Sequence, residues 1–198
     1  MHEICYNISS RYQKYITHSI SRKKKQMNKI FIASLYLLIF TFTLHAKSFS
    51  MHQNSITFNA PDGFLTMSPE LIQIKYPKGN PPANVLTNES TESTIAYDIR
   101  AKSLPQSQIE ETGKAFESAY KRVVAGFKLN SNKIVQISGQ KWIQMEFISN
   151  TIDSEVYNIF LVTGYKGKML IFNLNTTLKE FNKYESAFRK SIQSIILK

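Results

Sequence analysis

Cysteine and histidine are almost absent from this sequence. Its 198 residues contain one cysteine, Cys5, and four histidines, at positions 2, 18, 45 and 52. A single thiol excludes a disulfide framework and any cysteine-rich zinc module. Seven glycines and six prolines exclude collagen-like and low-complexity chains. With 42% hydrophobic and 20% charged residues, the chain has the composition of a small folded protein of one domain.

Positive charge is in excess, but much of it lies in the N-terminal part. The formal net charge is +11. Residues 1–46 hold seven basic residues and one acid, so the remaining 152 residues carry 18 basic and 13 acidic groups. That balance is ordinary for a soluble domain, and we predict no nucleic-acid partner. We interpret the following basic pairs as solvated surface: Lys121-Arg122, Lys166/Lys168 and Arg189-Lys190.

One hydrophobic run indicates export. Ile30–Leu44 holds 15 uncharged, mostly large apolar residues, preceded by Lys29. A membrane span needs about 20 residues, whereas a secretory signal peptide has an apolar stretch of this length. We therefore predict a signal peptide at 27–46, with cleavage between Ala46 and Lys47. The protein is then periplasmic or secreted, and it contacts a membrane only through this segment during export.

Residues 1–26 are unusual upstream of such a segment, because they contain Arg22-Lys23-Lys24-Lys25 and no regular apolar pattern. We interpret them as an over-extended reading frame, with translation starting at Met27. The alternative is an uncleaved signal anchor with a basic cytoplasmic tail. After the signal peptide, we expect a flexible linker at 47–54 and a single domain at 55–198.

The first half of this domain is predicted to be mostly strands. Alternating apolar residues favour strands at Ser55–Asn59, Phe64–Met67, Leu71–Tyr76 and Thr94–Ala101. Between the last two, Pro77–Ser93 is polar and contains three prolines, so we predict a loop there. Loops of this length are often functional, which makes this loop the best binding candidate.

The second half is predicted to contain two helices around a meander of strands. Ser107-x-x-Glu110 and Thr177-x-x-Glu180 match the capping box and predict helix starts, the first helix ending near Ala125. The strand-like runs between them are Lys133–Ser138, Trp142–Ser149, Val156–Thr163 and Met169–Thr176. Their short connections fit only antiparallel pairing. We predict an α+β fold, a helix–sheet–helix sandwich in which helices flank both faces of an antiparallel sheet.

The side chains available for catalysis are few. His52 is the only histidine after the predicted cleavage site, and it falls in the expected linker. A two-histidine metal site and a Cys–His pair are therefore excluded from the exported part, and a Ser–His–Asp triad is disfavoured. We predict no enzyme, no cofactor, no metal site, and no catalytic or cofactor-binding residues.

The remaining candidates have structural explanations. Glu110-Glu111 open a helix, where the helix dipole favours acids. Asp153 and Glu155 lie in a hairpin connection and are expected to be solvated. Trp142 directly precedes Ile143, which shares one apolar face of the strand with Met145 and Phe147, so Trp142 points to the opposite face. It is expected to be a core residue under a helix.

Two segments of the domain carry a family resemblance. They are the opening Phe58-Asn-Ala-Pro61-Asp-Gly63-Phe64 and the closing helix with Phe181, Phe188 and Ile192-Gln-Ser194-Ile195. Together with the order of elements over about residues 55–197, they resemble the PsbP-like superfamily, which includes the bacterial DcrB-like proteins. The resemblance implies an antiparallel sheet flanked by helices, no common catalytic residues, and protein interaction as the shared function.

Three interpretations of function follow. The first is an exported non-enzymatic protein-interaction domain, such as an envelope accessory or chaperone-like factor, with an unidentified protein partner. The second is a periplasmic small-molecule binder or hydrolase with a pocket near the 77–93 loop. The third is a surface protein that binds host glycans or anionic lipid through its positive charge, with salt-sensitive binding as its signature.

Overall fold

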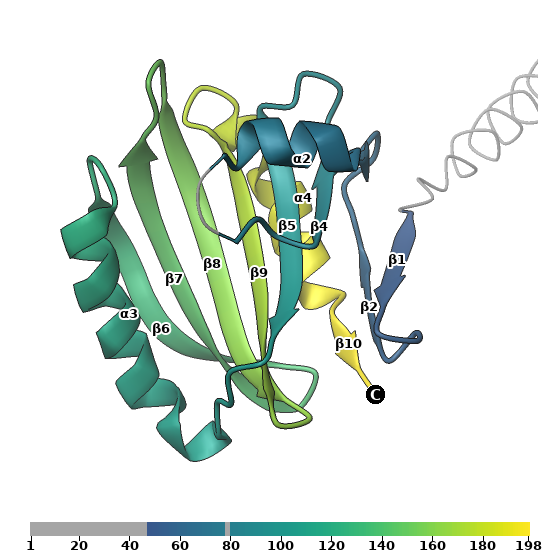
Figure 1. Cartoon of the computed structure of the whole chain (residues 1–198), viewed down its shortest axis with the longest axis vertical. Coiled ribbons are helices and arrows are strands. Elements are labelled where there is room, and N and C mark those ends of the chain that lie inside the picture. The colour runs from purple at the N-terminus through teal and green to yellow at the C-terminus, as the bar shows by residue number, and fades with distance from the viewer. Residues whose placement is uncertain (1–46, 78–79) are drawn as a thin grey trace, which may run out of the picture. The chain divides into compact units, whose positions relative to one another are not determined.

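The computed structural model describes residues 47–77 and 80–198, which fold around one large antiparallel sheet (Figure 1). Three α-helices accompany the sheet in this part of the chain, so the predicted α+β class is confirmed. The predicted signal peptide at 27–46 and the extension at 1–26 lie outside the described residues, and so does Ala46 of the predicted cleavage site.

The large sheet has seven strands, and every neighbouring pair is antiparallel. In spatial order they are β3 (Leu65–Thr66), β4 (Asn84–Thr87), β5 (Ser93–Arg100), β9 (Lys168–Thr177), β8 (Glu155–Tyr165), β7 (Gln140–Asn150) and β6 (Lys128–Ile137). The antiparallel meander predicted for the second half is confirmed. Its first strand, β6, begins five residues before the predicted run.

A second, smaller sheet contains β1 (Ser48–Met51), β2 (Ile56–Asn59) and β10 (Ile196–Leu197). β1 lies in the segment that we expected to be a flexible linker. It is ordered there because four residue pairs join it to β2 and the Phe49 ring stacks on Phe58, with ring centroids 6.0 Å apart. His52 is therefore in the β1–β2 turn, where it is exposed.

Helix α2 (Pro69–Lys75) replaces a predicted strand at Leu71–Tyr76. The Ser68 hydroxyl accepts a hydrogen bond from the Leu71 backbone amide, and Pro69 occupies the first turn. Both features start helices. The apolar residues of this segment fit either periodicity, and the hydrogen bonds from the Ile72 amide to Ser68 O and from the Tyr76 amide to Ile72 O show that the helical one applies.

The other helices are η2 (Gln106–Gln108), α3 (Ile109–Val123) and α4 (Phe181–Gln193). Both predicted helices exist, but neither predicted capping box forms. Ser107 lies inside the 3-10 turn η2, and Thr177 is the last residue of β9. The residues at the actual helix starts, Gln108 and Glu180, make no side-chain capping bond.

Strand β4 corrects the prediction of a loop throughout Pro77–Ser93. It is held between β3 and β5, and both Val85 and Leu86 are fully buried. Two adjacent buried apolar residues face opposite sides of a strand, so this short segment needs cover on both sides. The prolines lie before β4, and only 88–92 remains as the loop to β5.

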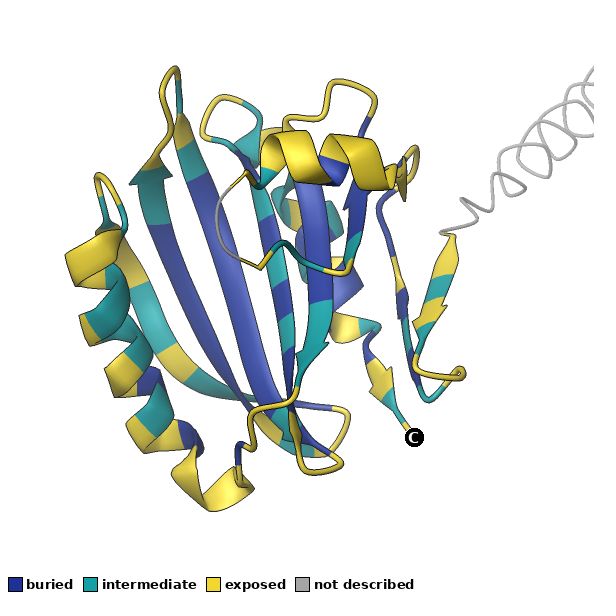
Figure 2. Cartoon of the chain, in the orientation of Figure 1, coloured by how far each residue is buried: buried dark blue, intermediate teal, exposed yellow. Residues whose placement is uncertain are grey.

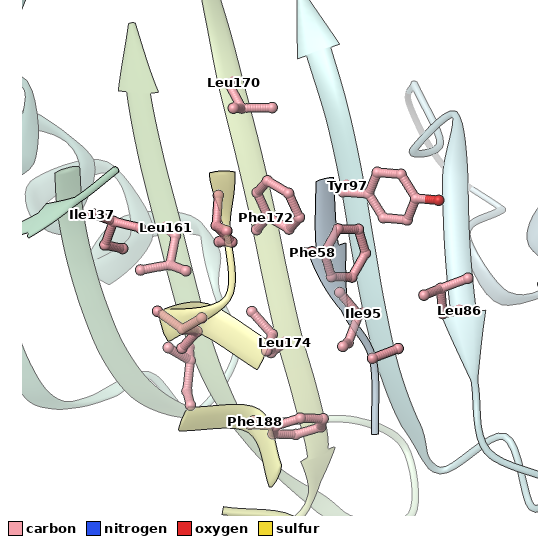
Figure 3. Packing of buried hydrophobic residues seen from close by; sticks show 14 of the residues in the cluster. Phe58, Leu86, Ile95, Tyr97, Ile137, Leu161, Leu170, Phe172, Leu174 and Phe188 are labelled. Atoms are coloured by element: carbon pink, nitrogen blue, oxygen red, sulfur yellow. The ribbon is translucent and has the colours of Figure 1, made fainter. Parts of the chain in front are cut away.

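Alternate residues of β8 enter two separate clusters of buried side chains. Ile159 and Leu161 belong to the larger cluster, which includes Phe188 of α4 and Phe58 of β2 (Figure 3). Phe160 and Val162 belong to the second cluster, against which Phe116 and Tyr120 of α3 pack. Figure 2 shows the central strands as the most buried part of the fold.

Trp142 is confirmed as a core residue. Its side chain is fully buried in the larger cluster, and its indole N–H donates to the Ile137 carbonyl at 3.1 Å.

Candidate functional site

One end of the large sheet, which we call the loop end, gathers the segments 88–92, 151–154 and 178–180 with helix α2 and the end of α3. It is at the top of Figure 1. Lys75 Nζ of α2 donates to the Thr91 carbonyl. The Leu178 amide donates to the Glu155 carbonyl, and the amide at the end of β7 donates to the carbonyl at 125, each at 2.8 Å. These contacts connect the loop end from α2 across to α3.

Large hydrophobic side chains are exposed at the loop end. Among the described residues, seven of the eight exposed large hydrophobic side chains lie there: Leu65, Leu71, Ile74, Val123, Leu129, Ile152 and Leu178. Ile152 is completely exposed and Ile74 is 74% exposed. Scattered apolar residues are normal on a protein surface, but these seven share one end of the sheet, from β3 at one edge to β6 at the other.

A cavity of about 550 Å³ opens at the loop end. It is lined by Glu92, Asp153, Ser154, Glu155, Thr177, Leu178 and Lys179. Glu92 belongs to the loop that the sequence singled out, which is therefore placed beside a hollow. Glu155 also pairs with Lys128 at 3.1 Å across the surface.

The chemistry of this cavity is limited. Hydrogen bonds from the hydroxyls of Thr151 and Ser154 hold the pKa of Asp153 below its usual value, so it remains ionised at neutral pH. An ionised carboxylate cannot act as a general acid. In the described part of the chain, no group of three or more His, Cys, Asp or Glu residues is arranged to hold a metal ion.

A second cavity, of about 480 Å³, lies between α3 and the segment before it. Its apolar lining includes Leu104, Phe116 and Met169, with Lys102 and Glu111 among its polar residues. Glu110 is 3.5 Å from Lys141 Nζ on the surface. Glu110 and Glu111 lie in the first turn of α3, as predicted, where the helix dipole favours acidic side chains.

A buried charge with several hydrogen-bond donors, within the described part of the chain, was missed by the sequence analysis. Glu146 of β7 is 4% exposed and accepts two hydrogen bonds from Arg189 of α4, both at 2.7 Å. The Tyr157 hydroxyl donates to the Glu146 carboxylate at 2.7 Å, and Gln144 Nε2 donates to the same carboxylate at 2.6 Å. The signal was an acid on a strand otherwise rich in apolar residues, but its partner lies 43 residues away in sequence.

Burial by itself raises the pKa of Glu146, but the hydrogen bonds from Arg189, Tyr157 and Gln144 outweigh it and lower the pKa to about 2. Because all these donors satisfy a buried carboxylate, we assign this cluster a structural role in holding α4 against β7.

The described residues contain no helix with the length and hydrophobicity of a membrane span. No family model matches the sequence, and no curated protein matches it either.

Solved structures with a similar fold do exist. The cyanobacterial PsbP (CyanoP) of Synechocystis sp. PCC 6803 is 16% identical, with a TM-score of 0.56 over 80% of this chain and 96% of that one. LpqN of Mycobacterium tuberculosis, involved in cell envelope biogenesis, is 10% identical, with a TM-score of 0.52 over 78% of this chain and 92% of that one.

The Ran-binding protein Mog1p of Saccharomyces cerevisiae is 12% identical, with a TM-score of 0.52 over 78% of this chain and 96% of that one. At such identities the likeness concerns the fold alone. By its topology, the chain has the PsbP-like fold.

Proposed function

We propose that this chain is an exported, non-enzymatic protein-interaction domain that holds its partner at the loop end. The observation that carries the proposal is the gathering of seven exposed large hydrophobic side chains at that end of the described structure. In this proposal the sheet, with α3 and α4 on opposite faces as a helix–sheet–helix sandwich, is the rigid support. The partner is a protein of the periplasm or the extracellular medium, reached through the signal peptide at 27–46.

Several properties support a protein partner. Exposed aliphatic side chains such as Ile74 and Ile152 stand on a helix and a hairpin tip, where they can enter apolar pockets of another surface. The fold occurs in proteins with interaction roles, since Mog1p is described as Ran-binding. The few catalytic side chains of the exported part agree with a role that needs no enzyme chemistry and no cofactor.

Site-specific photo-crosslinking tests the proposal. A photoreactive amino acid is placed at Ile74, Ile152 or, as a control, at Gln136, an exposed residue of β6. We expect one discrete adduct from positions 74 and 152 and none from 136. The I74D/I152D double variant, probed from Leu178, should lose at least tenfold in adduct yield, because burial of each aliphatic side chain favours binding by about 1.5–3 kcal/mol. Equal adducts from all positions, or a measured turnover without any adduct, would contradict the proposal.

A small-molecule binder remains the second candidate, and the cavity of about 550 Å³ beside the 88–92 loop favours it. Its carboxylates, including Glu92, suit a small cationic ligand. Thermal unfolding in the presence of small amines tests this candidate. A ligand that raises the Tm of the wild-type protein but not of Glu92→Gln would support it, and no shift with any amine would speak against it.

A further inference from the structure

The opposite end of the large sheet, which we call the turn end, is built from the turns 138–139 and 166–167, the segment 101–105 and the C-terminal residues 196–198. Hydrogen bonds hold these parts together. The Leu197 amide donates to Ser138 Oγ at 2.9 Å, and Tyr165 OH, beside the 166–167 turn, donates to the main-chain oxygen of Lys198 at 2.6 Å. The turn end is therefore a fixed platform and not a set of independent loops.

Basic residues are concentrated on this platform. They are Arg100, Lys102, Lys141, Lys166, Lys168 and Lys198. Adjacent strands lie about 4.8 Å apart, so the ends of β5, β9, β8 and β7 span roughly 15 Å. Arg100 pairs with Asp98 and Lys141 with Glu110.

The other four lysines, at 102, 166, 168 and 198, are exposed, and no carboxylate of the described residues lies within ion-pair distance of them. The loop end differs, because three carboxylates and a single lysine line its cavity. The positive surplus of the described domain is thus directed toward the turn end.

Lys166 has a backbone conformation that is unfavourable for a lysine. It forms the β8–β9 turn with Gly167, and their φ angles are 47° and 73°. Two residues with positive φ make a turn that favours Asn-Gly, since a Cβ crowds the backbone in this conformation. A lysine therefore occupies the tip of the platform against its conformational preference, as Ser138 does in the β6–β7 turn with Gly139.

The composition of the platform favours a lipid surface over a protein or a nucleic acid. Lysine is depleted at the centres of protein interfaces, where Tyr, Trp and Arg are enriched. The one exposed large hydrophobic residue of the turn end, within the described ranges, is Ile196. Tyr165, the aromatic residue of the β8–β9 turn, is 4% exposed, so it offers no face for stacking a base. Compact ammonium charges gathered at one end of the sheet suit the phosphates of a bilayer.

We propose that the turn end binds the phosphate groups of an anionic phospholipid bilayer through Lys102, Lys166, Lys168 and Lys198. The proposal does not depend on the function of the loop end. The two surfaces lie at opposite ends of strands about ten residues long, roughly 30 Å apart, so the protein can hold a partner away from the membrane.

Vesicle flotation tests the proposal with the protein in the form that is purified from the cells that express and export it. The vesicles are phosphatidylcholine with or without 30% phosphatidylglycerol. We expect at least tenfold tighter binding with phosphatidylglycerol, weakening as salt increases. The variant K102Q/K166N/K168Q/K198Q should lose about fivefold per lysine, or several hundredfold in all. All variants share the N-terminal region, so differences between them isolate the domain surface.

The matched control removes four charges elsewhere, in K114Q/K121Q/R122Q/K179Q, and should lose less than threefold. An equal loss in both variants would show that net charge alone matters and would overturn the proposal. So would tighter binding to heparin or to a DNA duplex than to phosphatidylglycerol vesicles, or the absence of any lipid preference.

Lys166→Asn alone gives a second, sharper readout. Asn suits the turn better, so the variant should have a higher Tm, while its vesicle affinity falls about fivefold. A purely structural lysine would move both quantities in the same direction or leave binding unchanged, and either result would overturn the role of this residue. Loss of lipid binding would leave crosslinking from Ile152 intact, which separates this proposal from the proposed function.

Discussion

Gly164 of β8 lies where the segment before α3 crosses the sheet. A Cβ at this position would be 1.7 Å from the Leu104 carbonyl oxygen, a backbone atom that cannot turn aside. Gly113 of α3 also faces the sheet, but a Cβ there would meet Ile143 and Asn132 at 3.5 and 3.6 Å, which is ordinary contact. Of these two close approaches, only the one at Gly164 requires glycine for lack of space.

Gly164→Ala should therefore lower the free energy of unfolding by about 2 kcal/mol, because the Leu104 segment must move. Gly113→Ala serves as the control and should raise it by about 0.5–1 kcal/mol, since alanine favours the helix. Urea denaturation measures both. A stabilised Gly164→Ala would show that the 101–105 segment is not held against β8.

Glu146 makes the stability depend on pH. Its pKa is lowered from the usual 4.5 to about 2 in the folded protein, so the ionised form stabilises the fold above pH 4.5. As the pH falls from 4.5 toward 2, the wild-type protein should lose up to about 3 kcal/mol from this group. Glu146→Gln should be less stable at pH 7 and lack this part of the acid dependence. Urea titrations between pH 2 and 7 measure it.

Glu155→Gln is the matched control for that experiment. It removes a carboxylate from an exposed pair with Lys128, whose contribution should be small. It should retain the loss of stability between pH 4.5 and 2 that Glu146 causes. A Glu146→Gln profile parallel to the wild type would contradict the structural role of the Arg189 pair.

At the scale of elements, the helix starts show which polar side chains act as caps. Ser68 bonds the Leu71 amide at 3.3 Å and caps α2, whereas Ser107 in η2 makes no capping bond. The same sequence preference thus has different outcomes, because a 3-10 turn moves the start of α3 past Ser107.

Ser68→Ala should lower the free energy of unfolding by about 1 kcal/mol, and Ser107→Ala should change it by less than about 0.5 kcal/mol. Thermal unfolding of both variants, followed by circular dichroism, makes the comparison. A larger loss from Ser107→Ala would mean that the predicted capping box does form.

At the scale of the whole molecule, one sheet supports both clusters of buried side chains. Trp142 lies in the larger cluster, and its neighbour Ile143 lies in the cluster under α3. A strand that contributes to two cores cannot lose one of them without disturbing the other, so unfolding should be cooperative.

The single tryptophan makes this cooperativity measurable. Trp142 fluorescence reports the larger cluster, and far-ultraviolet circular dichroism reports the whole domain. The two urea midpoints should coincide. Separate midpoints would show that the two clusters unfold independently.

Much of the fold followed from local pattern. The short connections between strand-like runs such as Val156–Thr163 and Met169–Thr176 required antiparallel pairing, and the structure confirms it. The apolar stripes predicted both helices that cover the main clusters. The strand assigned to Leu71–Tyr76 was wrong because a short apolar run fits two periodicities, and only packing against the sheet selects one.

The fold class, the direction of the strands and the scarcity of catalytic side chains could be predicted from the sequence, because each depends on residues close in the chain or on composition. The tertiary structure alone decided that Glu146 meets Arg189, that the exposed aliphatic side chains share one end and that the lysines of separate turns share the other. These residues are far apart in sequence, and only the pairing of the strands and the packing of α4 on the sheet bring them together.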